Sequence, residues 1–262
     1  MNESSERAKR AAALIAQCWR DASKRGDLPE SARPRTLAEG YRAQAQLPAA
    51  MDDSVVGYKL AATAAAGQRH LGVDGPVIGR LLASRVASDG ATLAMQGNRM
   101  LVAECEFVFK LARDLPPRDT PYDRDEVMAA VQSLHPGLEI PDSRFTDFAS
   151  AGAAQLAADN ACAHWMVVGP ATPANWRDVD LARHATCLHI NGQIAVRGRG
   201  EDVLGDPRNA LTWLANQFAV LGEGLRAGQL VTTGVTGRPG AISSADRISA
   251  DLGEFGKVTA QV

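Results

Sequence analysis

Hydrophobic positions in the first part of this chain recur with helical spacing. Residues 1–24 carry an apolar face repeated every three or four positions, which predicts an amphipathic helix. Thr36 is a candidate N-cap for a second helix over residues 37–46. The alanine-rich residues 61–71, closed by Gly72, predict a third helix. The N-terminal section is therefore expected to be mainly helical.

Beyond Gly79 the pattern changes to short β-forming runs separated by Gly, Asp and Asn. Asn191 and Gly192 divide one of these runs and form a strong hairpin-turn signal. Two further helices are predicted at residues 124–133 and 207–221. The predicted strands are residues 55–60, 101–111, 138–141, 163–168, 184–196, 229–233, 247–252 and 257–262.

The order of these elements indicates the fold class. Strands and helices do not alternate strictly, which argues against a doubly wound parallel sheet. The sequence predicts an α+β protein, in which a helical N-terminal section (residues 1–75) packs on a β-rich core (residues 76–262). We expect the two parts to form one structural unit.

Composition excludes several classes of protein. The net charge is −2, so the chain lacks the basic character of a nucleic-acid binder. No run approaches the ~20 apolar residues of a membrane span, and charged residues interrupt the N-terminus where a signal peptide would be apolar. The four cysteines lack CxxC spacing and fit reduced thiols. We therefore expect a cytoplasmic protein that binds neither nucleic acid nor membrane.

Two acids in the predicted strand at residues 101–111 are the most informative feature. The run is otherwise apolar or β-forming, as in a buried strand, yet it contains Glu104 and Glu106. Residues two apart in a strand project from the same face, so the two carboxylates should lie side by side. If they are buried, a shared proton, basic side chains or a hard cation such as Mg²⁺ or Mn²⁺ must compensate them. The alternative is an exposed edge strand whose acids face water.

A third acid, Glu139, lies inside the short apolar run at residues 138–141. Taken alone, such an acid is usually an edge residue or forms a salt bridge, here with Arg144. Together, Glu104, Glu106 and Glu139 would form a three-carboxylate set that leaves coordination positions open for a bidentate substrate.

The spacing of these acids resembles a known family. Glu-x-Glu followed by Leu-Glu-Ile-x-Asp-Ser-Arg is similar to the 2-oxopent-4-enoate hydratase and 4-oxalocrotonate decarboxylase branch of the fumarylacetoacetate hydrolase superfamily. The resemblance implies a mixed β-roll or barrel with flanking helices, assembled into homo-oligomers. It also implies Mg²⁺ or Mn²⁺ held by Glu104, Glu106 and Glu139. Further matching segments are residues 57–60, 71–79, 158–161, 198–200, 204–216 and 230–234.

The same resemblance implies roles for four more residues. Lys59 would be an acid/base group, with Asp74 as a second catalytic group, and Asn160 and Thr233 would contact the substrate. Three of them have a plain alternative: Lys59 as a surface lysine, Asp74 as a turn residue and Asn160 as the cap of a local turn.

The implied activity is hydration of a 2-hydroxy-2,4-dienoate to a 4-hydroxy-2-oxo acid in aromatic catabolism, by a metal-dependent lyase. Three residues depart from the hydratase pattern: Val77 stands where many hydratases have Asp, Cys162 where many have Ser, and Asp206 where His or Asn is usual. The Val77 change favours the alternative of a 2-oxo-enedioate decarboxylase. Hydrolysis of an acylpyruvate would need a His-Glu pair near the N-terminus, where only His70 stands.

A hypothesis from another class is a non-catalytic 2-oxo-acid-binding or assembly subunit. A complex with a paired pathway enzyme is a further expectation of the resemblance.

Overall fold

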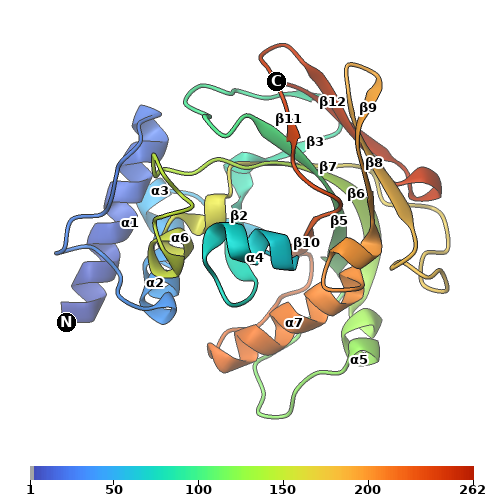
Figure 1. Ribbon diagram of the computed structural model, residues 1–262. Helices are drawn as coiled ribbons and strands as arrows, with labels where there is room; N and C mark the ends of the chain where they lie inside the picture. The colour runs from blue at the N-terminus through green and yellow to red at the C-terminus, as the bar shows by residue number, and fades with distance from the viewer. Residues whose placement is uncertain (1–2) are drawn as a thin grey trace.

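The computed structural model describes residues 3–262, in which two β-sheets pack together and helices gather at one side and below (Figure 1). The helices are α1 Glu3–Asp21, α2 Leu37–Gln44, α3 Leu47–Met51, α4 Ala65–Leu71, α5 Arg124–Ala129, α6 Ala153–Ala158 and α7 Pro207–Val220. The short 3₁₀ turns are η1 Ala83–Arg85, η2 Asn160–Cys162, η3 Gly200–Asp202 and η4 Gly253–Phe255. The strands are β1 Val55–Ala61, β2 Val77–Leu82, β3 Val86–Ser88, β4 Ala91–Thr92, β5 Val102–Leu111, β6 Val131–Ile140, β7 Trp165–Val168, β8 Ala185–Ile190, β9 Gln193–Arg199, β10 Leu230–Val235, β11 Gly240–Ala241, β12 Arg247–Asp251 and β13 Lys257–Gln261.

The larger sheet has the order β2-β1-β10-β5-β6-β7-β3, with β11 added beside β5, and it curls into a half-barrel (Figure 1). The smaller sheet has the order β4-β13-β12-β8-β9. This mixed, curled architecture confirms the predicted α+β class and the roll or barrel that the family resemblance implied.

Strand β5 has two chemically different faces. Its odd-numbered residues, including Phe107 and Phe109, lie in the main core between the two sheets and are fully buried. Its even-numbered residues face the inside of the half-barrel, where Val108 packs with Leu81 and Met166. Because side chains alternate along a strand, Glu104 and Glu106 project into the same interior.

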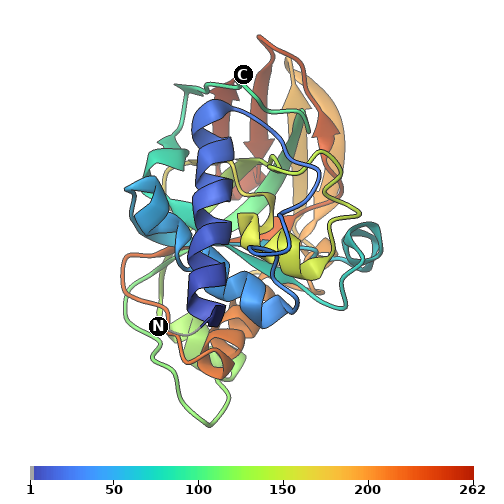
Figure 2. The ribbon, with the colours of Figure 1, turned by 90° about the vertical axis from the view of Figure 1, so that its left-hand side faces the viewer.

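The N-terminal helices form a smaller core of their own. Ile15 and Trp19 of α1 pack with Leu28, Leu47 and Phe145, and this cluster joins the helices to the segment after β6. Figure 2 shows α1 lying across this side of the molecule, in front of the sheets. Strand β1 precedes residue 75 but is paired on both sides within the larger sheet. The sheet therefore begins before the predicted boundary, and the division at residue 75 stays a prediction.

Local sequence signals account for several element ends. Thr36 caps α2, and the Asp206 side chain caps α7 by accepting the Arg208 N–H. Gly72 ends α4 in the left-handed conformation that glycine favours. Two predicted helices were too long. The helix expected at residues 124–133 ends at Ala129, because the following residues pair with β5 over the length of β6. The helix expected at residues 61–71 begins only at Ala65, because Ala61 is the last residue of β1.

Within residues 3–262, no helix combines the length and apolar character needed to cross a bilayer. The four cysteines are unpaired, and Cys18, Cys105 and Cys162 are buried.

Candidate metal centre

Glu104, Glu106 and Glu139 converge inside the half-barrel. Glu104 and Glu139 are directly paired across β5 and β6, and Glu106 lies two residues along on the same face. One oxygen from each carboxylate lies within 4.8 Å of the others. The ligand oxygens of an octahedral Mg²⁺ site are about 3–4 Å apart, given Mg–O bonds of 2.0–2.1 Å. A small inward movement of the side chains would therefore suit a divalent cation.

Each of the two deeper carboxylates keeps one oxygen without a partner. Glu106 Oε2 accepts the backbone N–H of Gly234 at 2.8 Å, and Glu139 Oε1 pairs with Lys59 Nζ at 3.0 Å. Glu106 Oε1 and Glu139 Oε2 are buried and have no hydrogen-bond partner among the described residues. A buried charged oxygen without a donor is costly, so these two atoms fit the ligands of a cation.

The electrostatics of the cluster point the same way. The pKa of Glu104 is raised to about 8 by burial and by the Glu139 charge, against the opposing effect of Lys59. The pKa of Glu106 is raised well above its usual value, first by burial and then by the other two carboxylates. Burial lowers the pKa of Lys59, but the three carboxylates outweigh burial and raise it overall. One ammonium therefore faces three carboxylates, and a divalent cation would complete the charge balance.

Lys59 is fixed from two sides. Besides the Glu139 pair, its Nζ donates to the carbonyl oxygen of Ala161 at 3.1 Å. That carbonyl belongs to η2, where Asn160, Ala161 and Cys162 have φ values of 59°, 50° and 59°. Left-handed backbone costs about 1–2 kcal/mol for each such L-residue. Strain of this kind persists where the surroundings enforce it, which is common at functional sites.

The Asn160 side chain stabilises this turn. Its Oδ1 accepts the Arg80 N–H at 2.6 Å, and its Nδ2 donates to the Arg80 carbonyl at 2.8 Å. The amide thus pairs with the backbone of β2, so Asn160 supports the site from behind. Its predicted contact with substrate stays a prediction.

The end of β10 explains how Glu106 is held. Register is irregular between Thr232 and Val235, and Gly234 adopts φ +103°, where a Cβ would collide with the Thr63 side chain. Glycine at this position lets the backbone N–H turn toward Glu106. Thr233 donates its hydroxyl to the Phe107 carbonyl at 3.1 Å, on the core side of the sheet, so its predicted substrate contact also stays a prediction.

A cavity of about 430 Å³ opens beside the carboxylates, with Lys59 and Glu104 among its lining residues. His70 and Arg238 also line it, although no motif pointed to them. For Arg238, the only sequence signal was its position four residues after Gly234. The predicted catalytic Asp74 is exposed and is not among the residues that line this cavity. Much of the wall is apolar and includes Ala61, Leu71, Met100, Val102, Phe148 and Val235.

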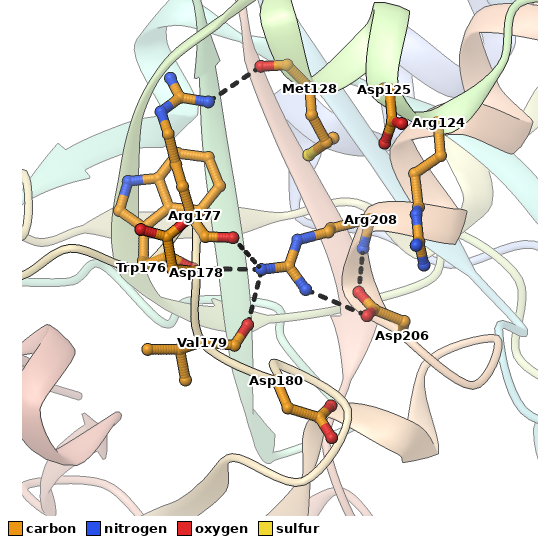
Figure 3. A pocket seen from close by; sticks show the side chains of 10 residues that line it. All are labelled: Arg124, Asp125, Met128, Trp176, Arg177, Asp178, Val179, Asp180, Asp206 and Arg208. Atoms are coloured by element: carbon orange, nitrogen blue, oxygen red, sulfur yellow. Dashed lines mark hydrogen bonds and ion pairs between the residues drawn. The ribbon is translucent and has the colours of Figure 1, made fainter.

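A second hollow of about 420 Å³ lies near the start of α7 (Figure 3). Its central cation, Arg208, pairs with Asp206 and donates to the carbonyls of Trp176, Arg177 and Val179. The Arg208 hydrogen bonds are thus used to hold the segment before β8. This explains Asp206, which departs from the hydratase pattern: it caps α7 and neutralises Arg208. The carboxylate cavity is therefore the candidate functional site.

Comparison with known proteins identifies the family of this chain. Residues 49–262 match the family model described as fumarylacetoacetate (FAA) hydrolase C-terminal. The chain belongs to the fumarylacetoacetate hydrolase family. It is 34% identical to a 2-keto-4-pentenoate hydratase of Burkholderia vietnamiensis, over 79% of this chain and 78% of that protein. It is 33% identical to a 2-hydroxyhexa-2,4-dienoate hydratase of Comamonas testosteroni, over 72% of this chain and 71% of that protein.

A solved structure resembles almost the whole chain. The 4-oxalocrotonate decarboxylase of Pseudomonas putida G7, complexed with magnesium and adipate, superposes with a TM-score of 0.87 at 25% sequence identity. The match covers 98% of this chain and 97% of the decarboxylase. The chain thus resembles hydratases in sequence and a decarboxylase in structure.

Proposed function

We propose that this protein is a metal-dependent hydro-lyase that hydrates a 2-hydroxy-2,4-dienoate to a 4-hydroxy-2-oxo acid in aromatic catabolism. The observation that carries the proposal is the set of three converging carboxylates, two of them buried with an unpartnered oxygen, beside a largely apolar cavity. Two relatives whose names state this kind of hydration, at 33% and 34% identity, support it.

In this proposal Glu104, Glu106 and Glu139 hold Mg²⁺ or Mn²⁺, the hard cations that all-oxygen sites favour. Such an ion supplies Lewis-acid chemistry, polarising the oxygen on carbon 2 and stabilising negative charge that develops there. The magnesium in the decarboxylase structure supports the choice of ion.

Lys59 is the proposed proton-carrying group. Two of its three N–H bonds are assigned, to Glu139 and to Ala161, and the third is available to a substrate in the cavity. Its Nζ can hold or release a proton while the dienol becomes the 2-oxo form. Addition of water across the remaining conjugated double bond then gives the 4-hydroxy-2-oxo acid. The apolar wall would hold the hydrocarbon end of the substrate and exclude other water.

Decarboxylation of a 2-oxo-enedioate is the second candidate, and one observation favours it. Arg238 and His70 line the cavity, and either side chain could face a second carboxylate. The decarboxylase structure holds adipate, which carries two carboxylates. Both reactions would develop negative charge on the oxygen at carbon 2. The metal-binding carboxylates of the protein therefore do not distinguish one reaction from the other.

The test is loss of the conjugated ultraviolet absorbance of 2-hydroxypenta-2,4-dienoate in the presence of Mg²⁺, with EDTA as the first control and Glu106→Gln as the second. EDTA-sensitive formation of 4-hydroxy-2-oxopentanoate by the parent protein alone is the expected result. Release of carbon dioxide from 2-oxohex-3-enedioate, without hydration, would replace the proposal with the decarboxylase. Binding of a 2-oxo acid without turnover of either substrate would indicate the non-catalytic alternative.

We also propose that the protein acts in the cytoplasm as a homo-oligomer. Light scattering of the purified chain gives the mass that checks the assembly, and a monomeric mass would contradict it.

A further inference from the structure

Thr232 carries a buried hydroxyl that the mechanism above does not use. The residue is 0% exposed, and its Oγ1 has no hydrogen-bond partner among the described residues. Leaving a buried hydroxyl unpaired destabilises the folded protein. Its neighbour Thr233, by contrast, has satisfied its hydroxyl with the Phe107 carbonyl. An unsatisfied buried group of this kind calls for an explanation.

Strand register places Thr232 on the face of the carboxylates. Thr232 is paired with Val108 of β5, and Glu106 lies two residues away on the same face. The pairing of Gly57 with Leu230 puts Lys59 and Thr232, each two residues further along, on this face as well. Diagonal neighbours in a sheet are within reach of long side chains.

The Glu106 carboxylate is also oriented toward β10, where its Oε2 accepts the Gly234 N–H. Two unpartnered oxygens, Thr232 Oγ1 and Glu106 Oε1, therefore belong to side chains that share one buried interior. The remaining sides of this interior are apolar, formed by Leu81, Val108 and Met166. These side chains offer Thr232 no alternative polar partner.

We infer that Thr232 is a positioning residue of the metal centre: its hydroxyl donates to one buried water, which in turn donates to Glu106 Oε1. This bridge fixes the carboxylate orientation in which that oxygen can bind the cation. A carboxylate oxygen accepts more than one bond, so the water and a cation can share it. Outer partners of ligand groups typically change metal affinity 10–100-fold. The inference rests on the proposed metal centre.

The experiment compares three variants by Mn²⁺ binding, followed by electron paramagnetic resonance, and by thermal unfolding in EDTA. Thr232→Val keeps the shape and removes the hydroxyl, Thr232→Ser keeps the hydroxyl, and Thr233→Val removes the neighbouring hydroxyl on the opposite face. We expect Thr232→Val to bind Mn²⁺ about 10–100-fold more weakly. Thr232→Ser and Thr233→Val should stay within a few-fold of the parent.

Unfolding in EDTA separates positioning from a structural role. Thr232→Val should unfold at close to the temperature of the parent, because it loses no direct hydrogen bond to another protein group. Thr233→Val should unfold at a lower temperature, because it loses the bond to Phe107. Unchanged Mn²⁺ affinity in Thr232→Val, or a loss that Thr232→Ser does not restore, would overturn the inference.

The parent protein distinguishes the two proposals. If it binds no Mn²⁺, the metal centre and the role of Thr232 are both wrong. If it binds Mn²⁺ and the variants behave as expected, but no dienoate is hydrated, only the proposed reaction is wrong.

Discussion

Two buried polar clusters lie close together in this chain, and only one of them is left incomplete. The first is the carboxylate site of Glu104, Glu106, Glu139 and Lys59. The second lies where the helical section meets the half-barrel, and we call it the junction network. Its members are Lys24, Asn98, Asp142, Ser143, Arg144, Asp159 and His164.

The acids of the junction network are fully partnered. Asp159 is 0% exposed, and it accepts bonds from the Ser143 hydroxyl and from the backbone and guanidinium of Arg144. Asp142 pairs with Lys24 and accepts the backbone N–H of Arg99. Both acids of the junction network thus have a cation and further donors at hydrogen-bond distance.

The comparison shows that burial of an acid does not by itself indicate a functional site. Glu139 and Asp142 are three residues apart and both buried, yet one has an unpartnered oxygen and the other does not. The distinguishing property is an excess of carboxylates over cations, with oxygens that no protein group satisfies. If this is correct, neutralising an acid should harm the junction network and leave the fold of the carboxylate site intact.

The largest effect is expected in the junction network. Asp159→Asn leaves the buried Arg144 guanidinium without its counter-charge, which typically costs about 3–5 kcal/mol of unfolding free energy. Urea unfolding measures this loss. The matched control is Asp180→Asn, the same change in an exposed pair with Arg183, which should alter stability little. Equal stability of Asp159→Asn and the parent would show that the network is not a structural support.

The next effect concerns the metal-dependent part of stability. Glu106→Gln removes one of three crowded negative charges, while its amide oxygen can still accept the Gly234 N–H. Without metal, we expect the variant to be as stable as the parent or more stable. At 100 times the dissociation constant, Mg²⁺ should stabilise the parent by about 2.7 kcal/mol and the variant not at all. Unfolding with and without Mg²⁺ checks this, and an equal gain in both proteins would contradict the site.

Sequence patterns predicted those features that depend on local periodicity. Alternation in β5 was enough to put Glu104 and Glu106 on one face, and the Asp206 signal was enough to start α7. The helix expected to run to residue 133 failed, because pairing with β5 overrides local propensity there. Local patterns do not encode such long-range pairing.

The partners of buried charges were equally hard to predict. Arg144 was a candidate partner for Glu139, but it pairs with Asp159, while Lys59 takes Glu139. Both pairs join residues from separate elements, so local spacing does not reveal them. Which of Thr232 and Thr233 faces the carboxylates depends on the pairing of Thr232 with Val108, which no spacing rule reveals.

The smallest expected effect, taken for each pH unit, is a pH dependence that arises in the junction network. The pKa of His164 is lowered to about 3, first by burial and then by the charges of Arg144 and Arg85, with Lys24 adding to the shift and Asp142 opposing it. Asn98 donates from its Nδ2 to the Pro141 carbonyl and faces His164 Nδ1 at 3.1 Å. The ring nitrogen there is therefore the acceptor, and protonating it would break this contact.

Because the folded protein resists protonating His164, the unfolded chain binds more protons between about pH 3 and the ordinary histidine pKa of about 6.5. Stability is therefore lost as the pH falls through this window, by at most about 1.4 kcal/mol for each pH unit from this group. His164→Asn keeps an acceptor for Asn98 but does not titrate. Urea unfolding at several pH values should show a shallower loss in the variant than in the parent. Parallel curves would place the acid sensitivity elsewhere and weaken the view that burial and the nearby arginines keep His164 neutral in this network.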